Sequence, residues 1–135
     1  MRGDMVDLLS FNLRRRSYDV IVARTGTDAL NKARKHLPDL VLLDLMLDGL
    51  DGFTVCEFLR RQPSTADIPV IMITALSGQI SRVNGLAAGA DEFITKPFDV
   101  QNLMNRVGFL IEAQQQKLRL RTMEAGQENS ESTGR

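Results

Sequence analysis

Three polar residues of this sequence could act together on a phosphoryl group, because each follows a short apolar or β-branched run. Asp44 comes after Leu40–Leu43, Thr74 after Val70–Ile73, and Lys96 after a short run that ends in Ile94 and Thr95. A carboxylate can serve as a nucleophile. An ammonium and a hydroxyl can neutralise and hydrogen-bond phosphoryl oxygens. We therefore predict a phosphoryl site that combines Asp44, Thr74 and Lys96.

Each of the three residues also has a simpler interpretation when it is taken alone. An aspartate after a strand is often a turn or helix cap. A threonine at a strand end commonly bonds to the backbone, and a lysine before a proline is commonly solvated. The combination is more specific than its members, because all three lie at the same end of successive predicted strands.

The elements that must position these residues alternate along the chain. Strand-like segments are expected at residues 18–23, 39–44, 68–74 and 92–95. Helical patterns are expected at residues 4–16, 25–36, 53–61 and 78–88, and from residue 99 onward. Strands that alternate with helices favour an open parallel sheet covered on both faces. In such α/β sheets, ligands bind outside the carboxyl ends of the strands.

The composition and charge of the sequence disfavour several classes of protein. Seventeen basic and seventeen acidic residues cancel, so no net charge favours nucleic acid or a membrane surface. No apolar run is long enough to span a bilayer, and the amino end lacks the apolar core of a signal peptide. The single Cys56 cannot form an internal disulfide, which favours a reducing compartment. We expect a cytoplasmic protein.

Two regions are expected in the chain. Residues 1–113 hold all the predicted strands and are expected to form one domain. After that the composition becomes polar, and residues 114–135 are expected to be a helical extension followed by a disordered tail from Gly126.

Three segments carry a resemblance to a known family. They are Leu42–Gly52 around Asp44, Ile71–Ala75 around Thr74, and Gly89–Phe98 around Lys96. Together with their spacing, they resemble the receiver domains of two-component response regulators, over about residues 4–113. The resemblance implies a flavodoxin-like, doubly wound parallel α/β sheet of the (βα)5 type, and a signalling protein that is not an enzyme.

The same resemblance implies the roles of individual residues. Asp44 would accept phosphate from a histidine kinase or a phosphotransfer protein. Thr74 and Ala75 would form the phosphoryl-binding switch segment, and Lys96 would pair with the phosphate. Mg²⁺ would be held by Asp44, by the backbone carbonyl of Met46 and by an acidic pair.

Phe93 would be the switch aromatic of such a domain. Thr74 would move toward the phosphate, the ring would turn into the vacated space, and the surface of the last strand and its flanking helices would change. That surface would bind a downstream protein, an output domain or a second copy of the chain. The simpler interpretation of Phe93 is a core ring.

One departure from the family is severe. The family opens with a hydrophobic strand that ends in the acidic pair, but Asp4–Leu9 resembles the start of the first helix, so the pair would lie before or at Met1. A shortened chain or a start site assigned too far downstream would explain this, and so would a receiver that has lost metal binding. Mg²⁺ prefers several oxygen ligands, so the chain as written is expected to take no phosphate with Mg²⁺, unless Asp4 or Asp7 substitutes.

Three functional classes remain open from the sequence. The first is a phosphorylation-controlled switch, and the second is a degenerate receiver that binds proteins without taking phosphate. The third is a flavodoxin-like enzyme or flavin carrier, which the 5% aromatic content and the lack of tryptophan disfavour. The effect of Asp44→Asn on partner binding would separate the first two.

Overall fold

The computed structural model describes residues 2–45, 51–75 and 79–133, with side chains for 5–45, 51–75 and 83–124. In chain order the elements are α1 (Arg2–Arg15), α2 (Gly26–His36), β1 (Val41–Asp44), α3 (Gly52–Arg61), β2 (Val70–Thr74), α4 (Gln79–Ala87), β3 (Glu92–Thr95) and α5 (Val100–Thr133). Each of these elements was expected from the sequence, with ends that differ by a few residues.

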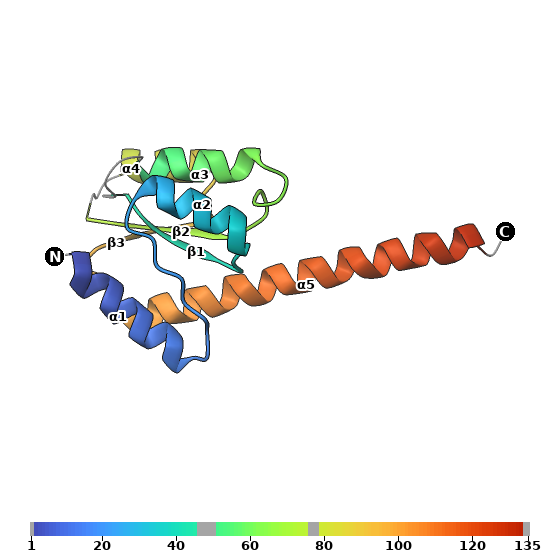
Figure 1. The fold of residues 1–135 in the computed structure, drawn as a ribbon, viewed down its shortest axis with the longest axis horizontal. Helices are drawn as coiled ribbons and strands as arrows, with labels where there is room; N and C mark the ends of the chain where they lie inside the picture. The colour runs from blue at the N-terminus through green and yellow to red at the C-terminus, as the bar shows by residue number, and fades with distance from the viewer. Residues whose placement is uncertain (1, 46–50, 76–78, 134–135) are drawn as a thin grey trace.

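The strands form a parallel three-stranded sheet in the order β1-β2-β3. Figure 1 shows the sheet nearly edge-on, with α2, α3 and α4 on one face and α1 and α5 on the other. This arrangement confirms the predicted doubly wound α/β fold. It brings the carboxyl ends of all three strands to one edge, because parallel strands run in the same direction.

Alternate residues of β2 supply two separate apolar cores. Val70 and Met72 pack in the core that contains residues of α2 and α3. Ile71 and Ile73 pack in the other core, with residues of α1 and α5 such as Leu9 and Leu103. All five residues of β2 are buried. A central parallel strand covered on both faces reads as a continuous apolar run, which is the pattern that predicted it.

The expected strand at residues 18–23 is not formed, which corrects the prediction from the sequence. Residues 18–23 have no assigned secondary structure, and the described sheet ends at β1. A strand needs a neighbour to accept its backbone hydrogen bonds. β-branched composition alone cannot supply that neighbour, so the segment runs between α1 and α2 without ladder pairing.

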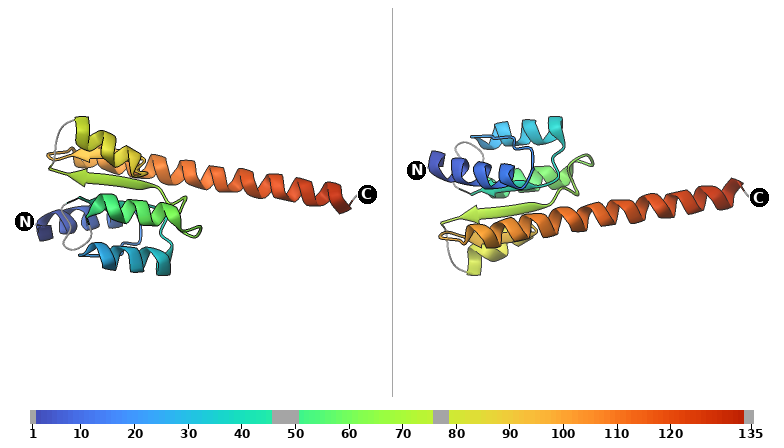
Figure 2. Two further views of the ribbon diagram at one scale, coloured as in Figure 1. Left: turned by 90° about the horizontal axis from the view of Figure 1, so that it is seen from above. Right: turned by 90° about the horizontal axis from the view of Figure 1, so that it is seen from below.

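The last helix also differs from the expectation. α5 is continuous from Val100 to Thr133, so residues 126–133, expected to be disordered, are helical. Figure 2 shows the helix projecting well beyond the rest of the fold. The packed residues Leu103 and Val107 fix its first turns. Each further residue then adds a hydrogen bond without a new nucleation cost.

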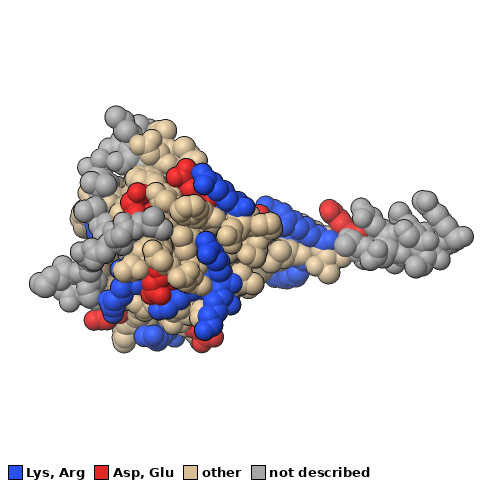
Figure 3. Space-filling view, turned by 45° about the horizontal axis from the view of Figure 1, so that its top comes forward, with Lys and Arg blue, Asp and Glu red and all other residues tan. Residues whose placement is uncertain are grey.

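Basic side chains accompany the projecting part of α5, as Figure 3 shows. Lys117, Arg119 and Arg121 lie in this stretch, and all three are exposed. Arg121 reaches back to the loop before β2, where its Nη1 lies 3.0 Å from a carboxylate oxygen of Asp67. Within the described residues, no helix is both long enough and apolar enough to span a membrane.

Candidate functional site

The carboxyl edge of the sheet brings two of the predicted site residues into direct contact. Asp44 is the last residue of β1, and Lys96 follows the last residue of β3. The Nζ of Lys96 lies 3.3 Å from Oδ2 of Asp44. The Asp44 side chain is only 13% exposed, against 30% for Lys96. A carboxylate and an ammonium cation therefore share one partly buried site.

Thr74 ends the central strand, between the strands that carry Asp44 and Lys96. β2 pairs with β1 on one side, where Ile73 is in register with Asp44, and with β3 on the other, where Thr74 is in register with Thr95. The Thr74 residue is fully buried. Ala75, the next residue, is exposed. A buried threonine followed by an exposed alanine marks the point where the chain leaves the core.

Backbone hydrogen bonds hold this edge together. The amide of Leu45, just after Asp44, donates to the carbonyl of Ile73 over 3.2 Å, and the amide of Lys96 donates to the carbonyl of Thr74 over 2.7 Å. The ladder thus continues one residue beyond β1 and β3. The Lys96 amide is fixed beside Thr74 at the end of the central strand, and the Lys96 side chain reaches from there to Asp44.

The start of α3 packs against the backbone at the end of β1. Asp51 caps this helix, because its carboxylate accepts hydrogen bonds from the amide and hydroxyl of Thr54. A Cβ on Gly52 would lie 2.6 Å from a side-chain carbon of Leu45 and 3.3 Å from the Asp44 carbonyl oxygen. Only glycine permits this close approach. Sequence reasoning read residues 51–52 as a loop and missed both roles, although an aspartate before an amphipathic run is a capping signal.

Phe93 lies inside the core, with 3% of its surface exposed. A Cβ on Gly85 of α4 would lie 2.7 Å from the Phe93 ring and 3.2 Å from the sulfur of Met72. The ring therefore packs directly against the backbone of α4. Phe93 is a buried ring that joins β3 to the helix beside it, and this packing fits both a core ring and a switch aromatic.

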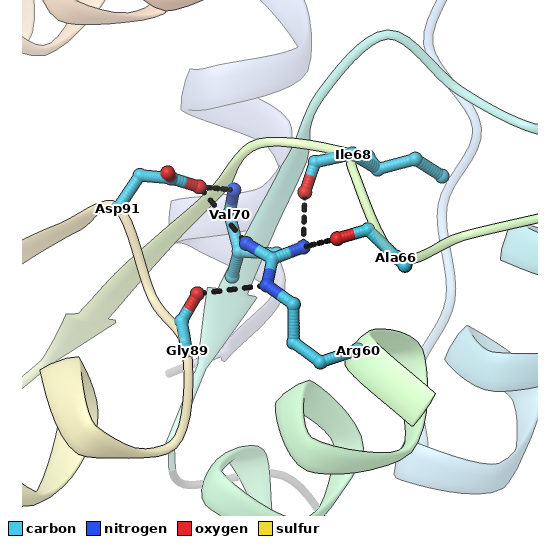
Figure 4. Close-up of polar contacts among 6 residues, drawn as sticks. All are labelled: Arg60, Ala66, Ile68, Val70, Gly89 and Asp91. Atoms are coloured by element: carbon cyan, nitrogen blue, oxygen red, sulfur yellow. Dashed lines mark hydrogen bonds and ion pairs between the residues drawn. The ribbon is translucent and has the colours of Figure 1, made fainter. Parts of the chain in front are cut away.

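Near the start of β2, Arg60 of α3 forms a cluster of polar contacts with several segments (Figure 4). Its guanidinium donates to the carbonyl oxygens of Gly89, Ala66 and Ile68 and forms an ion pair of 2.9 Å with Asp91. Asp91 in turn accepts from the Val70 amide, at the start of the central strand. This cluster was not found from the sequence, since no spacing signal links an arginine to carbonyls.

Most of the metal ligands that the resemblance implies lie outside the residues that the structure describes. Met46 and the acidic pair lie outside the described residues, as does the Asp4 side chain. Asp7 is exposed on α1. Among the described residues, no group of three or more His, Cys, Asp or Glu side chains could hold a metal ion. The described part of the site thus offers Mg²⁺ fewer than three such side chains, and its Asp44 is already paired with a lysine, so this part alone does not fit the ion.

Cys56 and His36 lie in other parts of the structure. Cys56 is fully buried in the core of α2 and α3, and burial raises the pKa of its thiol. His36 is exposed at the end of α2. Neither residue belongs to the edge of the sheet that carries Asp44.

Comparisons with known proteins agree with this geometry. The family model described as response regulator receiver domain matches residues 3–108. The DNA-binding dual master transcriptional regulator RpaA of Synechocystis is 49% identical over 105 residues, which are 78% of this chain and 44% of that protein. The response regulator PleD of Caulobacter vibrioides is 48% identical over 102 residues, 76% of this chain and 22% of that protein. The chain therefore spans less than half of these relatives.

Solved structures show the same fold. The receiver domain of the Francisella response regulator 1452 aligns with a TM-score of 0.77 and 29% identity, covering 82% of this chain and 90% of that one. The BeF3-activated N-terminal receiver domain of Klebsiella pneumoniae RstA aligns with a TM-score of 0.74 and 31% identity, covering 80% and 90%.

Proposed function

The chain belongs to the response regulator receiver domain family, and from that premise we propose that Asp44 is its phosphoacceptor. The observation that carries the proposal is the ion pair between Asp44 and Lys96, at the end of a buried parallel sheet. Receiver domains of this family take part in two-component signalling with histidine kinases and output domains. They also generally bind Mg²⁺.

The transfer that we propose is a displacement at phosphorus. A carboxylate oxygen of Asp44 forms the new bond, and the bond from phosphorus to the donor's histidine nitrogen breaks, with the electron pair leaving on that nitrogen. Lys96 stays beside the carboxylate and neutralises charge on the phosphoryl oxygens. The Thr74 hydroxyl is the proposed hydrogen-bond donor, and Ala75 the proposed start of the segment that responds.

The conformational change that follows phosphorylation would involve Phe93. Its ring and the sulfur of Met72 both pack against Gly85, so a turn of the ring would press on α4. A downstream protein, an output domain or a second copy of the chain would read this change. The balanced charge and the lone buried cysteine support a cytoplasmic location and argue against direct binding of nucleic acid by this region.

A second candidate function is a degenerate receiver that binds proteins without taking phosphate. It is favoured by the shortage of carboxylates around Asp44 among the described residues. Mg²⁺ would need further oxygen ligands from outside that part of the chain. The two candidates share a fold and differ only in whether Asp44 reacts.

Intact-mass measurement with acetyl phosphate and Mg²⁺ separates the candidates. The chain of 135 residues is expected to take no phosphate. The same chain, extended at its amino end by a short apolar strand and two aspartates, is expected to gain a single phosphoryl adduct. The matched control is the extended chain with Asp44→Asn, which should gain none. An unmodified extended chain with Asp44 intact would favour the degenerate receiver.

A further inference from the structure

The part of α5 from Phe109 onward carries a row of exposed side chains at alternating spacings of four and three residues. The row, here called the seam, consists of Phe109, Ala113, Gln116, Leu120 and Met123. All five residues are exposed, and the three largest apolar ones, Phe109, Leu120 and Met123, have 68%, 60% and 62% of their surface exposed. This spacing is the heptad pattern with which one helix packs against another in a coiled coil.

The seam faces away from the body of the domain. Val107 packs in the core shared with α1, and Arg121 pairs with Asp67 in the loop before β2. At about 100° of rotation per residue, Val107 and Arg121 both lie more than about 100° around α5 from the middle of the seam. Leu118 lies nearly opposite the seam, and at 48% it is less exposed than Leu120. The helix therefore uses one face for its own domain and leaves the seam exposed.

An exposed apolar seam on a projecting helix is unfavourable in water. Figure 2 shows the far end of α5 extending past the other described elements. Helices owe most of their stability to the packing of an apolar face, and the rest of the folded chain leaves this face open to water. A second helix along the seam would bury Phe109, Leu120 and Met123.

Charged residues on both flanks of the seam indicate which helix would bind. Glu112 and Arg119 lie on one flank, and Lys117 and Glu124 lie on the other. All four are exposed, and among the described side chains none of them forms an ion pair. Figure 3 shows charges of both signs along this part of α5. These four charges are therefore available to a partner helix.

A second copy of this chain complements these charges. In a parallel two-helix coiled coil, a residue on one flank meets the residue five positions later on the other flank of the partner. Glu112 would meet the partner's Lys117, and Arg119 would meet the partner's Glu124. Because the two copies are related by a two-fold axis, each pair forms twice. Every flank contact within residues 109–124 thus joins opposite charges.

Gln116 favours the parallel, in-register arrangement over the antiparallel one. In a parallel pair the two Gln116 residues face each other, and each amide can donate a hydrogen bond to the oxygen of the other. In an antiparallel pair this position faces the alternate seam position, which is Ala113 or Leu120 within the seam. The amide would then be buried without a hydrogen-bond partner, at a cost in free energy.

We propose that residues 109–124 of α5 form a parallel, in-register two-helix coiled coil with a second copy of this chain. The seam is only about 20 Å long, at a rise of about 1.5 Å per residue. The dimer is therefore weak, with a Kd on the order of 100 µM. The packed start of α5 already meets the cost of helix nucleation, which favours so short a coil. This interface lies away from α4 and β3, and it does not depend on phosphorylation of Asp44.

Analytical ultracentrifugation of the full 135-residue chain, with no phosphoryl donor present, tests the interface. The share of dimer should rise between about 10 µM and about 1 mM of the native chain. Leu120→Gln should weaken the dimer by about tenfold or more, because a seam side chain loses its apolar contact. Leu118→Gln is the matched control, since it makes the same change on the opposite face, and it should leave dimerisation unchanged. A native chain that stays monomeric, or equal effects of the two variants, overturns the proposal.

Charge reversal tests the direction of the two helices. Glu112→Lys should weaken the dimer by about fivefold, because two attractive pairs become repulsive. Adding Lys117→Glu should restore the dimer, since each pair again joins opposite charges. The two residues lie about 140° apart around one helix, so this rescue must come from a contact between copies. In an antiparallel pair, residue 112 would meet the partner's Arg119 and residue 117 the partner's Glu124. The double variant would then dimerise less than Glu112→Lys alone, and that result overturns the parallel arrangement.

Discussion

Lys96 and Asp44 meet 3.3 Å apart although they end strands that are not neighbours in the sheet. The central strand β2 lies between them and contributes Thr74 at the same level. A phosphoryl group on Asp44 would therefore lie within reach of the lysine. The contact is also a measurable interaction in the unmodified protein.

Replacing Lys96 tests the energy of this contact. Lys96→Met should lower the free energy of unfolding by about 1–2 kcal/mol, because a mostly buried carboxylate loses a charged hydrogen-bond donor. Urea unfolding of Lys96→Met, Asp44→Asn and the double variant forms a cycle with the native chain. A coupling of about 1 kcal/mol is expected. Strictly additive effects would mean that the pair is not formed in solution.

Gly85 and Phe93 provide a test of the packing between α4 and β3. Gly85→Ala should lower the free energy of unfolding by about 1–3 kcal/mol, since its Cβ would meet the Phe93 ring at 2.7 Å. Adding Phe93→Leu should recover part of that loss by removing the ring.

Gly108 is the matched control for this substitution, because it also lies within a helix. A Cβ there would meet the Tyr18 hydroxyl at 3.6 Å, an ordinary contact. Gly108→Ala should therefore stabilise the protein by up to about 1 kcal/mol through helix propensity. Thermal unfolding of the two variants measures the direction of each change in stability. A stabilising Gly85→Ala would contradict the packing described above.

Among the charged residues described here, replacing Arg60 should lower the free energy of unfolding the most. Arg60→Gln should cost about 2–4 kcal/mol, because it leaves Asp91 and several partly buried carbonyls without their shared donor. Arg61→Gln is the control. Arg61 is exposed and lies 5.6 Å from the Phe58 ring, so its loss should cost at most about 1 kcal/mol. Chemical denaturation compares the free energies of unfolding of the two variants. Equal losses would mean that the contacts of Arg60 do not stabilise the fold specifically.

The pKa of Asp67 tests whether α5 contacts the loop before β2. The hydrogen bond from Arg121, together with its charge, lowers the pKa of Asp67. A lowered pKa in the folded state gives stability that is present above the ordinary pKa and is lost as the pH falls through the lowered value. The effect on stability should be small, because both side chains are more than half exposed.

NMR titration of the Asp67 carboxyl measures this contact directly. Arg121→Gln should return the pKa of Asp67 toward its ordinary value, while Arg119→Gln, on the same exposed stretch, should change it less. An unchanged Asp67 titration in Arg121→Gln would show that the projecting helix does not hold this contact in solution.

Local patterns in the sequence determined much of the fold. Val70–Ile73 is apolar at every position, which specifies a strand covered on both faces, and Thr25 caps α2 by accepting a hydrogen bond from the Asp28 amide. Strand ends and residue types then placed Asp44 and Lys96 at one edge, because parallel strands share a direction. These features depend on a residue and its near neighbours along the chain.

The tertiary structure decided what depends on partners distant in sequence. Residues 18–23 have strand composition but form no strand, since ladder pairing needs another strand beside them. Arg60 became an anchor only because folding brought Gly89 and Asp91 within hydrogen-bonding distance of its guanidinium. Gly85 matters for packing only because the Phe93 ring lies against its helix. Pairing and packing are properties of the assembled layers, so no local pattern could contain them.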